Sequence, residues 1–99
     1  MRKEIESRFH KFVADRVGYF EARHLYIKMG LPSHPVTKAF KKPENSPHMI
    51  LIAFSEILGI HPYELIRDYD LGVKRISDIE KEYLRKEFES LPVIKQQSD

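Results

Sequence analysis

The chain of 99 residues contains no cysteine. Without thiols it forms no disulfide, builds no cysteine-based zinc or iron–sulfur site and has no thiolate nucleophile, and it is compatible with a reducing cytosol. No apolar run approaches the roughly 20 residues that a membrane-spanning helix needs. The first residues are charged and periodic and lack the apolar core of a signal peptide. We therefore expect a cytoplasmic protein that does not bind a membrane.

Motifs that carry catalysis are also missing. The sequence has no glycine-rich phosphate loop, no G-x-S-x-G elbow and no Ser-x-x-Lys pair. Asp68 and Asp70 lie two residues apart without a base or metal partner in the pattern around them. No two histidines have the i, i+4 spacing of a helical metal site. We expect no enzyme, no cofactor and no metal site, and hence no ligand role for the five histidines His10, His24, His34, His48 and His61.

Charge is present in quantity but is unevenly distributed. The net charge is +2, yet residues 21–42 alone contain five Lys or Arg and one acidic residue. Residues 43–99 contain seven basic and eleven acidic residues, so the C-terminal half is acidic. Local charge predicts better than total charge which surface meets a polyanion. The basic stretch is therefore a candidate nucleic-acid surface, although such a run is also the ordinary solvated face of a protein.

Apolar residues recur at helical spacing along most of the chain. No segment alternates between apolar and polar residues as a half-buried strand would. The sequence therefore predicts an all-α fold of five or six short helices. The first is expected over residues 4–17, where Gly18 ends it. Its core-facing stripe consists of Ile5, Phe9, Phe12, Val13 and Val17.

The second half of the chain predicts three further helices. Ser46 is expected to be the N-cap of a helix that is apolar on almost every side, is therefore buried, and ends at Gly59. His61 opens a short helix after it. Ser77 and Glu80 form a capping box at the start of the last helix. The expected inward face of that helix is Ile79, Tyr83, Leu84, Phe88 and Leu91.

Residues 22–40 predict two short amphipathic helices separated by a tight turn. Gly30 can take the positive φ that ends the first of them, and Ser33 is expected to be the N-cap of the second. The inward positions are Leu25, Met29, Leu31, Val36 and Ala39. Basic residues surround these positions. Two short helices set across each other by a glycine turn, with a basic outer surface, indicate a helix-turn-helix that docks on DNA.

From about residue 8 to residue 67 the order of these features resembles the lambda-repressor-like family, also called the Cro/CI or XRE-type helix-turn-helix. The family's two-helix pattern is matched by Leu25, Met29, Gly30, Leu31, Ser33 and Val36. Its closing pattern, L-G-V-x-P-x-E-L after a buried helix, is similar to L-G-I-H-P-Y-E-L at residues 58–65. The resemblance implies a five-helix DNA-binding domain over residues 1–75. An extra C-terminal helix at 76–91 would pack on that domain or form a dimer face, and 92–99 would be a flexible tail.

In a helix-turn-helix the second helix presents its N-terminal residues and one outward stripe to the major groove. Lys38 can donate to guanine, and Thr37 can bond a base edge or touch a thymine methyl. Lys41 and Lys42, past the end of the helix, would meet phosphate. The candidate DNA-binding residues are Arg23, Lys28, Ser33, His34, Thr37, Lys38, Lys41 and Lys42. Each of them also suits an ordinary surface position.

The pattern as a whole predicts a sequence-specific, repressor-like transcriptional regulator that binds double-stranded DNA as a homodimer. An alternative is a protein–protein interaction module on the same fold, or an antitoxin whose acidic C-terminal helix binds a basic toxin. Tyr26, where the family usually has Ala, favours this alternative. So do Ala22, in place of a phosphate-holding Gln, and the lack of Arg or Gln in the second helix. Tyr83 and Phe88 suit either a core position or a dimer face.

Overall fold

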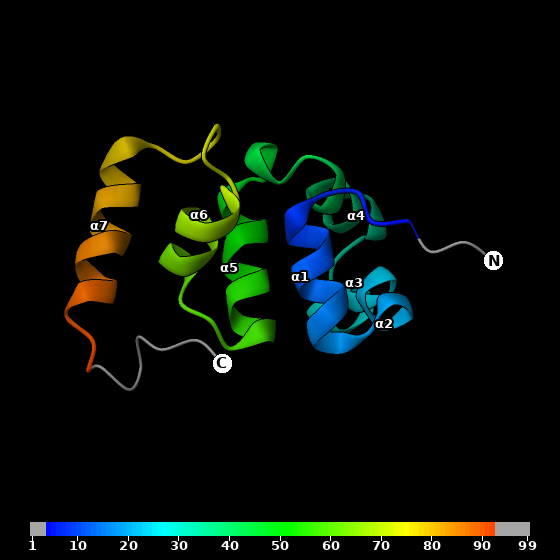
Figure 1. Ribbon diagram of the computed structural model, residues 1–99. Coiled ribbons are helices and arrows are strands. Elements are labelled where there is room, and N and C mark those ends of the chain that lie inside the picture. Colours follow the sequence, from blue (N-terminus) through cyan, green and yellow to red (C-terminus); the bar gives the residue numbers. More distant parts are fainter. Residues whose placement is uncertain (1–3, 93–99) are drawn as a thin grey trace.

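The computed structural model describes residues 4–92, and these residues are helical and contain no strand (Figure 1). The elements are α1 (Arg8–Val17), α2 (Tyr19–Arg23), α3 (Leu25–Met29), α4 (Ser33–Lys41), the 3-10 helix η1 (Pro43–Asn45), α5 (His48–Leu58), α6 (Pro62–Tyr69) and α7 (Asp78–Glu89). The all-α prediction is confirmed. The expected number of helices was too low, because the first of the two helices predicted around Gly30 is itself two helices, α2 and α3. They meet at His24, whose φ of −111° and ψ of 14° interrupt the helical geometry.

The helices are spread along the long axis of a body that measures 44 × 28 × 23 Å. In Figure 1, α2 and α3 lie at one end, α5 and α6 lie in the middle, and α7 lies at the opposite end. α5 is the central helix, as predicted, since Ile50, Leu51 and Phe54 are fully buried. Its apolar surface is not covered on every side, however, because Met49 remains 58% exposed.

Three phenylalanines join the N-terminal helices to α5. Phe9 of α1 and Phe54 of α5 meet edge to face, with ring centroids 4.8 Å apart. Phe40 of α4 lies 5.9 Å from Phe9 and 5.6 Å from Phe54. All three rings are buried. This contact fixes which side of α4 faces the core, and Val36 and Ala39 are buried on that same side.

The first helix begins later than predicted. Ser7 is the N-cap of α1, because its hydroxyl accepts a hydrogen bond from the backbone N–H of His10 at 3.0 Å. The expected start at residue 4 is therefore wrong, and Ile5 is 47% exposed instead of buried. Of the remaining predicted stripe, Phe9 and Val13 are fully buried, whereas Phe12 and Val17 are half-buried.

Two of the three predicted serine caps, those at Ser33 and Ser46, are wrong. Pro32 occupies the N-cap position of α4, and Ser33 is its first helical residue and makes no capping hydrogen bond. A cap at Ser33 would find one of its two usual donors missing, since Pro35 has no N–H. At α5 the N-cap position is likewise taken by a proline, Pro47, instead of Ser46.

The helix ends that depend on a single local residue follow the prediction. Gly30 and Gly59 are left-handed, with φ of 70° and 68°, and end α3 and α5. Ser77 caps α7 by accepting the N–H of Glu80 at 3.2 Å. The Glu80 carboxylate contacts the imidazole Nδ1 of His48 in α5, and this contact attaches the start of α7 to the core helix.

α7 is held mainly by one aromatic side chain. The ring of Phe88 lies 5.4 Å from His61 and 5.6 Å from Tyr63, and the Arg67 guanidinium lies 5.5 Å from it. The Nε2 atom of His61 also lies 2.8 Å from the carboxylate of Glu87. These contacts attach the C-terminal part of α7 to α6.

The predicted inward face of α7 is correct only in part. Leu84 and Phe88 are buried, but Ile79 is 85% exposed and Tyr83 is 61% exposed. One residue is about 100° of helical rotation, so the pair at 79 and 83 points away from the pair at 84 and 88. Phe88 is thus a core residue. Residues 93–99 of the predicted tail lie outside the described residues.

The connector between α6 and α7 is bonded to the loop after α4. The Gly72 N–H donates to the Pro43 carbonyl at 2.8 Å, and the Lys74 N–H donates to the Glu44 carbonyl at 2.9 Å. Gly72 has a φ of 79°, and a Cβ at this position would lie 3.1 Å from the Ser46 carbonyl oxygen of the other segment and 2.5 Å from the end of the Ile76 side chain. The close approach of the two segments therefore requires glycine here.

No single helix within residues 4–92 is long and apolar enough to cross a membrane. α5 and α6 reach the required length and hydropathy only when taken together, and the chain bends by 107° between them.

Replacing Gly72 by Ala should destabilise the protein by about 2–4 kcal/mol, since it adds left-handed backbone strain to a steric clash. Gly59→Ala is the matched control, because it has a similar φ and no atom within 4 Å of the added Cβ. It should cost about 1 kcal/mol. Urea denaturation followed by circular dichroism measures both values. Equal losses would mean that the segments at 43–46 and 72–76 are not in close contact.

Phe88→Ala should lower the free energy of unfolding by about 3–5 kcal/mol, because it removes a buried aromatic ring from the α6–α7 contact. Tyr83→Ala, which truncates an exposed aromatic ring on the same helix, should change it by less than about 0.5 kcal/mol. Thermal and urea denaturation of the two variants test this difference. Similar losses in both variants would contradict the packing of α7 described above.

Candidate nucleic-acid interface

The outward side of α4 carries most of the predicted DNA-binding residues. Val36, Ala39 and Phe40 face the core, so the opposite side of the helix is left to solvent. Five of the predicted residues are exposed there or at the end of the helix, namely Ser33, His34, Lys38, Lys41 and Lys42. Thr37 is half-buried, and its hydroxyl donates to the His34 carbonyl at 3.1 Å.

The lysines of this surface are free of acidic partners. Within residues 4–92 no carboxylate lies within ion-pair distance of Lys38, Lys41 or Lys42. Among the other lysines of residues 4–92, Lys11, Lys28 and Lys81 lie within ion-pair distance of a carboxylate, whereas no ion pair involves Lys74 or Lys86. Unpaired ammonium groups keep their full charge available for an anionic ligand.

The two predicted residues outside α4 have different surroundings. Arg23 of α2 lines the same hollow as Thr37 and Lys41, so the structure brings it to the α4 surface. Lys28 of α3 is exposed and forms a 2.8 Å ion pair with Glu21. The hydrogen bond from Lys28 lowers the pKa of the Glu21 carboxyl. Lys28 is therefore engaged within its own segment and lines neither of the hollows beside α4.

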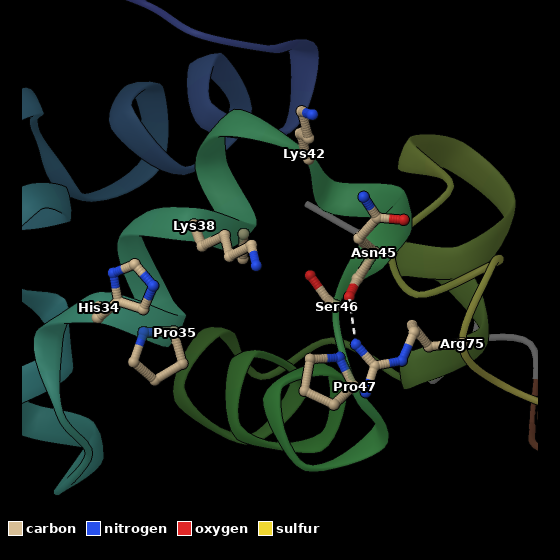
Figure 2. Close-up of a pocket in the computed structure, with 9 residues that line it drawn as sticks. His34, Pro35, Lys38, Lys42, Asn45, Ser46, Pro47 and Arg75 are labelled. Atoms are coloured by element: carbon tan, nitrogen blue, oxygen red, sulfur yellow. Dashed lines mark hydrogen bonds between the residues drawn. The ribbon is translucent and has the colours of Figure 1, made fainter.

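α4 forms a ridge between two hollows. The first, of about 200 Å³, separates α4 from η1 and the α6–α7 connector. Figure 2 shows the residues that line it, which include His34, Lys38, Lys42, Asn45, Ser46 and Arg75. The second, of about 340 Å³, lies between α4 and the helices α1 and α2. It is lined by Glu4, Glu6, His10, Tyr19, Arg23, Thr37, Phe40 and Lys41.

His10 is a buried polar residue beside the second hollow. Its Nδ1 accepts the backbone N–H of Glu6 at 3.1 Å, so the neutral ring carries its proton on Nε2. The Nε2 atom is buried and has no hydrogen-bond partner among residues 4–92. The ring is stacked on Phe40, with centroids 4.7 Å apart. Burial lowers the pKa of His10, and the nearby Arg23 lowers it further, against the opposite effect of Glu6.

Two of the three departures from the pattern described above, Ala22 and Tyr26, leave the α4 surface open. Ala22 is fully buried, so a side chain at this position faces the core and not a ligand. Tyr26 is half-buried against the core, with its ring 6.3 Å from that of His24. It does not cover the exposed lysines of α4. α7 lies at the other end of the molecule (Figure 1).

The sequence did not predict that three residues would line the hollows beside α4, namely His10, Ser46 and Arg75. Ser46 carried a signal, but it indicated a helix cap. Arg75 belongs to the connector after α6 and reaches α4 only because that connector is bonded to η1. No spacing in the sequence indicates such a meeting of distant segments.

Comparisons of the chain with protein-family models, curated proteins and solved structures found no match. Among residues 4–92 no group of three His, Asp or Glu side chains is arranged to hold a metal ion.

The buried His10 predicts a pH dependence of stability. Its pKa in the folded protein is lowered from the usual value of about 6.5, so the unfolded chain binds more protons below that pH. The contribution of neutral His10 to the free energy of unfolding is therefore complete above about pH 6.5. It is lost as the pH falls below that value. We expect a flatter stability profile between pH 7 and pH 5 in His10→Gln than in the unchanged protein, measured by urea denaturation. Parallel profiles would show that His10 titrates alike in both states.

Proposed function

We propose that this protein binds double-stranded DNA by placing α4 in the major groove and acts as a repressor-like transcriptional regulator. The observation that carries the proposal is the α4 surface itself. Its inner side is anchored by Phe40, while Lys38, Lys41 and Lys42 are exposed and have no acidic partner within residues 4–92. A helix of this kind meets the groove with its exposed stripe while the rest of the fold lies over the phosphate backbone.

The exposed residues divide into two groups by position. Ser33, His34 and Lys38 lie along the helix, where a bound duplex would present its base edges. Lys41 and Lys42, at the C-terminal end, suit contacts with phosphate. Such phosphate contacts supply affinity that falls steeply with salt, and base contacts supply sequence preference.

The proposal includes a homodimer. The apolar pair of Ile79 and Tyr83 on the outer side of α7 is the exposed surface that best suits a second copy. Because α5 and α6 lie between α7 and α4, a dimer joined through α7 would hold its two α4 helices at its far ends (Figure 1). Half-sites more than one helical turn, or ~34 Å, apart are then expected.

A second candidate function is binding of another protein through α7, as an interaction module or an antitoxin. The observation that favours it is the same exposed pair, Ile79 and Tyr83. The helix that carries this pair has five acidic residues, namely Asp78, Glu80, Glu82, Glu87 and Glu89. Exposed apolar residues surrounded by charge are typical of protein interfaces. This candidate differs from the first in requiring no contact between α4 and DNA.

Fluorescence anisotropy with a labelled random duplex across a salt series tests the DNA proposal. Lys38→Ala/Lys41→Ala should weaken binding about ten-fold or more at ~0.1 M salt and reduce the slope of log K against log salt by roughly two, or one per lysine. Lys11→Ala/Lys86→Ala removes the same charge away from α4 and is the matched control. Both double variants should have the same melting temperature as the unchanged protein.

Equal affinities of the two double variants would overturn the assignment of α4 as the DNA-binding helix. Absent binding by the unchanged protein, or binding that does not vary with salt, would favour the protein-binding candidate.

A further inference from the structure

We propose that the hollow lined by Lys38, Ser46 and Arg75 is a binding site for a phosphate group. The group has two possible sources, a phosphate of a DNA backbone or a free phosphate. The DNA form rests on the proposed function, whereas the free-phosphate form does not. The proposal rests on three separate features of the hollow, which are an unsatisfied hydroxyl, a set of cations and a helix end.

The first feature is the Ser46 hydroxyl. Ser46 is only 3% exposed, and its Oγ is buried without a hydrogen-bond partner among residues 4–92. A buried polar atom is nearly always bonded to protein, water or ligand, so an orphan atom indicates a missing partner. Figure 2 shows the Ser46 hydroxyl and the end of the Lys38 side chain pointing toward each other across the hollow. A phosphate group between them would accept hydrogen bonds from both side chains.

The second feature is the charge of the lining. Arg75 is held at the edge of the hollow, where its guanidinium donates to the Asn45 carbonyl at 3.4 Å (Figure 2). Lys38 lies on the opposite wall, and His34 and Lys42 lie at the rim. No acidic residue is among the side chains that line this hollow. A guanidinium, an ammonium and a hydroxyl are the donors with which proteins bind phosphate.

The third feature is the start of α5. This helix of 11 residues begins at His48, has no side-chain cap and has no acidic residue in its first turn. The N-terminus of a helix carries partial positive charge and unpaired N–H groups, which favour anions. Pro47, the residue before the helix, lines the hollow. The end of α5 therefore adds to the potential of the two side-chain cations.

The shape of the hollow favours phosphate over a carboxylate. The donors come from three segments, namely α4, the loop after η1 and the α6–α7 connector, and so approach from different directions. A tetrahedral phosphate offers an oxygen to each of them, whereas a carboxylate offers two oxygens in one plane. The volume of about 200 Å³ is below the ~300–1,000 Å³ of sites that enclose whole ligands. The site therefore suits a phosphate group whose remaining parts stay outside.

The walls are held in place before any ligand arrives. The Gly72 and Lys74 N–H groups donate to the carbonyls of Pro43 and Glu44, and these bonds set the connector beside the loop. Arg75 and Ser46 are therefore positioned by backbone contacts. A site assembled in advance loses little conformational entropy on binding.

The test uses two variants and two ligands. Ser46→Ala removes the orphan hydroxyl, and Arg75→Gln removes the guanidinium charge. Lys86→Gln on α7 is the control for loss of a charge. Ser46→Ala should retain or raise the melting temperature, since the buried hydroxyl has no hydrogen-bond partner among residues 4–92. Arg75→Gln provides an independent readout if Ser46→Ala folds poorly.

In the first arm, inorganic phosphate is titrated into the full chain and followed by the backbone amide NMR signals of Asn45, Ser46 and His48, against chloride at equal ionic strength. We expect saturable shifts with phosphate alone, weakened at least ten-fold in Ser46→Ala and Arg75→Gln but unchanged in Lys86→Gln. In the second arm, duplex DNA is titrated by anisotropy. Each of the two site variants should weaken binding, and Arg75→Gln should also reduce the salt slope by about one.

The outcomes separate the site from the proposed function. An effect on the DNA arm alone supports a backbone-phosphate site, and an effect on the phosphate arm alone supports a site for free phosphate. Phosphate binding by a protein that binds no DNA would support the site while overturning the proposed function. If Lys38→Ala/Lys41→Ala weakens DNA binding but neither Ser46→Ala nor Arg75→Gln affects either arm, the site is overturned and the proposed function stands. Equal NMR shifts with chloride and with phosphate would also overturn the phosphate site.

Discussion

The rings of Phe9, Phe40 and Phe54 meet where α1, α4 and α5 come together, and the orientation of α4 depends on this contact. Phe9 and Phe54 pack edge to face at 4.8 Å, and Phe40 lies within 6 Å of both. Aromatic pairs in such geometry contribute through their large buried area and through the match of ring edge to ring face. With Phe40 held inward, the lysines at 38, 41 and 42 have only the solvent side available.

The same packing leaves polar groups unsatisfied on both sides of α4. The Nε2 atom of His10 lies on one side and the Oγ atom of Ser46 on the other, and both are buried without a partner among residues 4–92. A third such atom, Oε1 of Glu64, has the Arg67 guanidinium 3.8 Å away, so charge compensation explains it. Within residues 4–92 no ion pair involves His10 or Ser46. Buried donors that lack acceptors are costly, and both of these donors lie beside α4, whose Lys38 and Lys41 are exposed.

Local chemistry explains which structural predictions succeeded. Gly30 and Gly59 end helices because a left-handed residue without a Cβ needs no tertiary support. Ser77 caps α7 because its donor lies three residues further along the same segment. Ser33 and Ser46 failed as caps because the neighbouring prolines, Pro32 before Ser33 and Pro47 after Ser46, occupy the cap positions. The rotation of α7 about its own axis, which buries Phe88 and exposes Tyr83, depends on contacts with the rings of His61 and Tyr63. No local pattern in α7 describes these contacts.

The sequence alone determined that the described chain is helical, where several of its helices end, and that positive charge is concentrated in residues 21–42. These properties follow from spacing, composition and single residues. The tertiary structure decided that α4 lies between two hollows and that Arg75 lies beside Ser46. The reason is that the bonds from Gly72 and Lys74 to η1 join segments that are distant in the sequence. Hydrogen bonds between backbone groups carry no signature in the side chains, so only the folded chain reveals them.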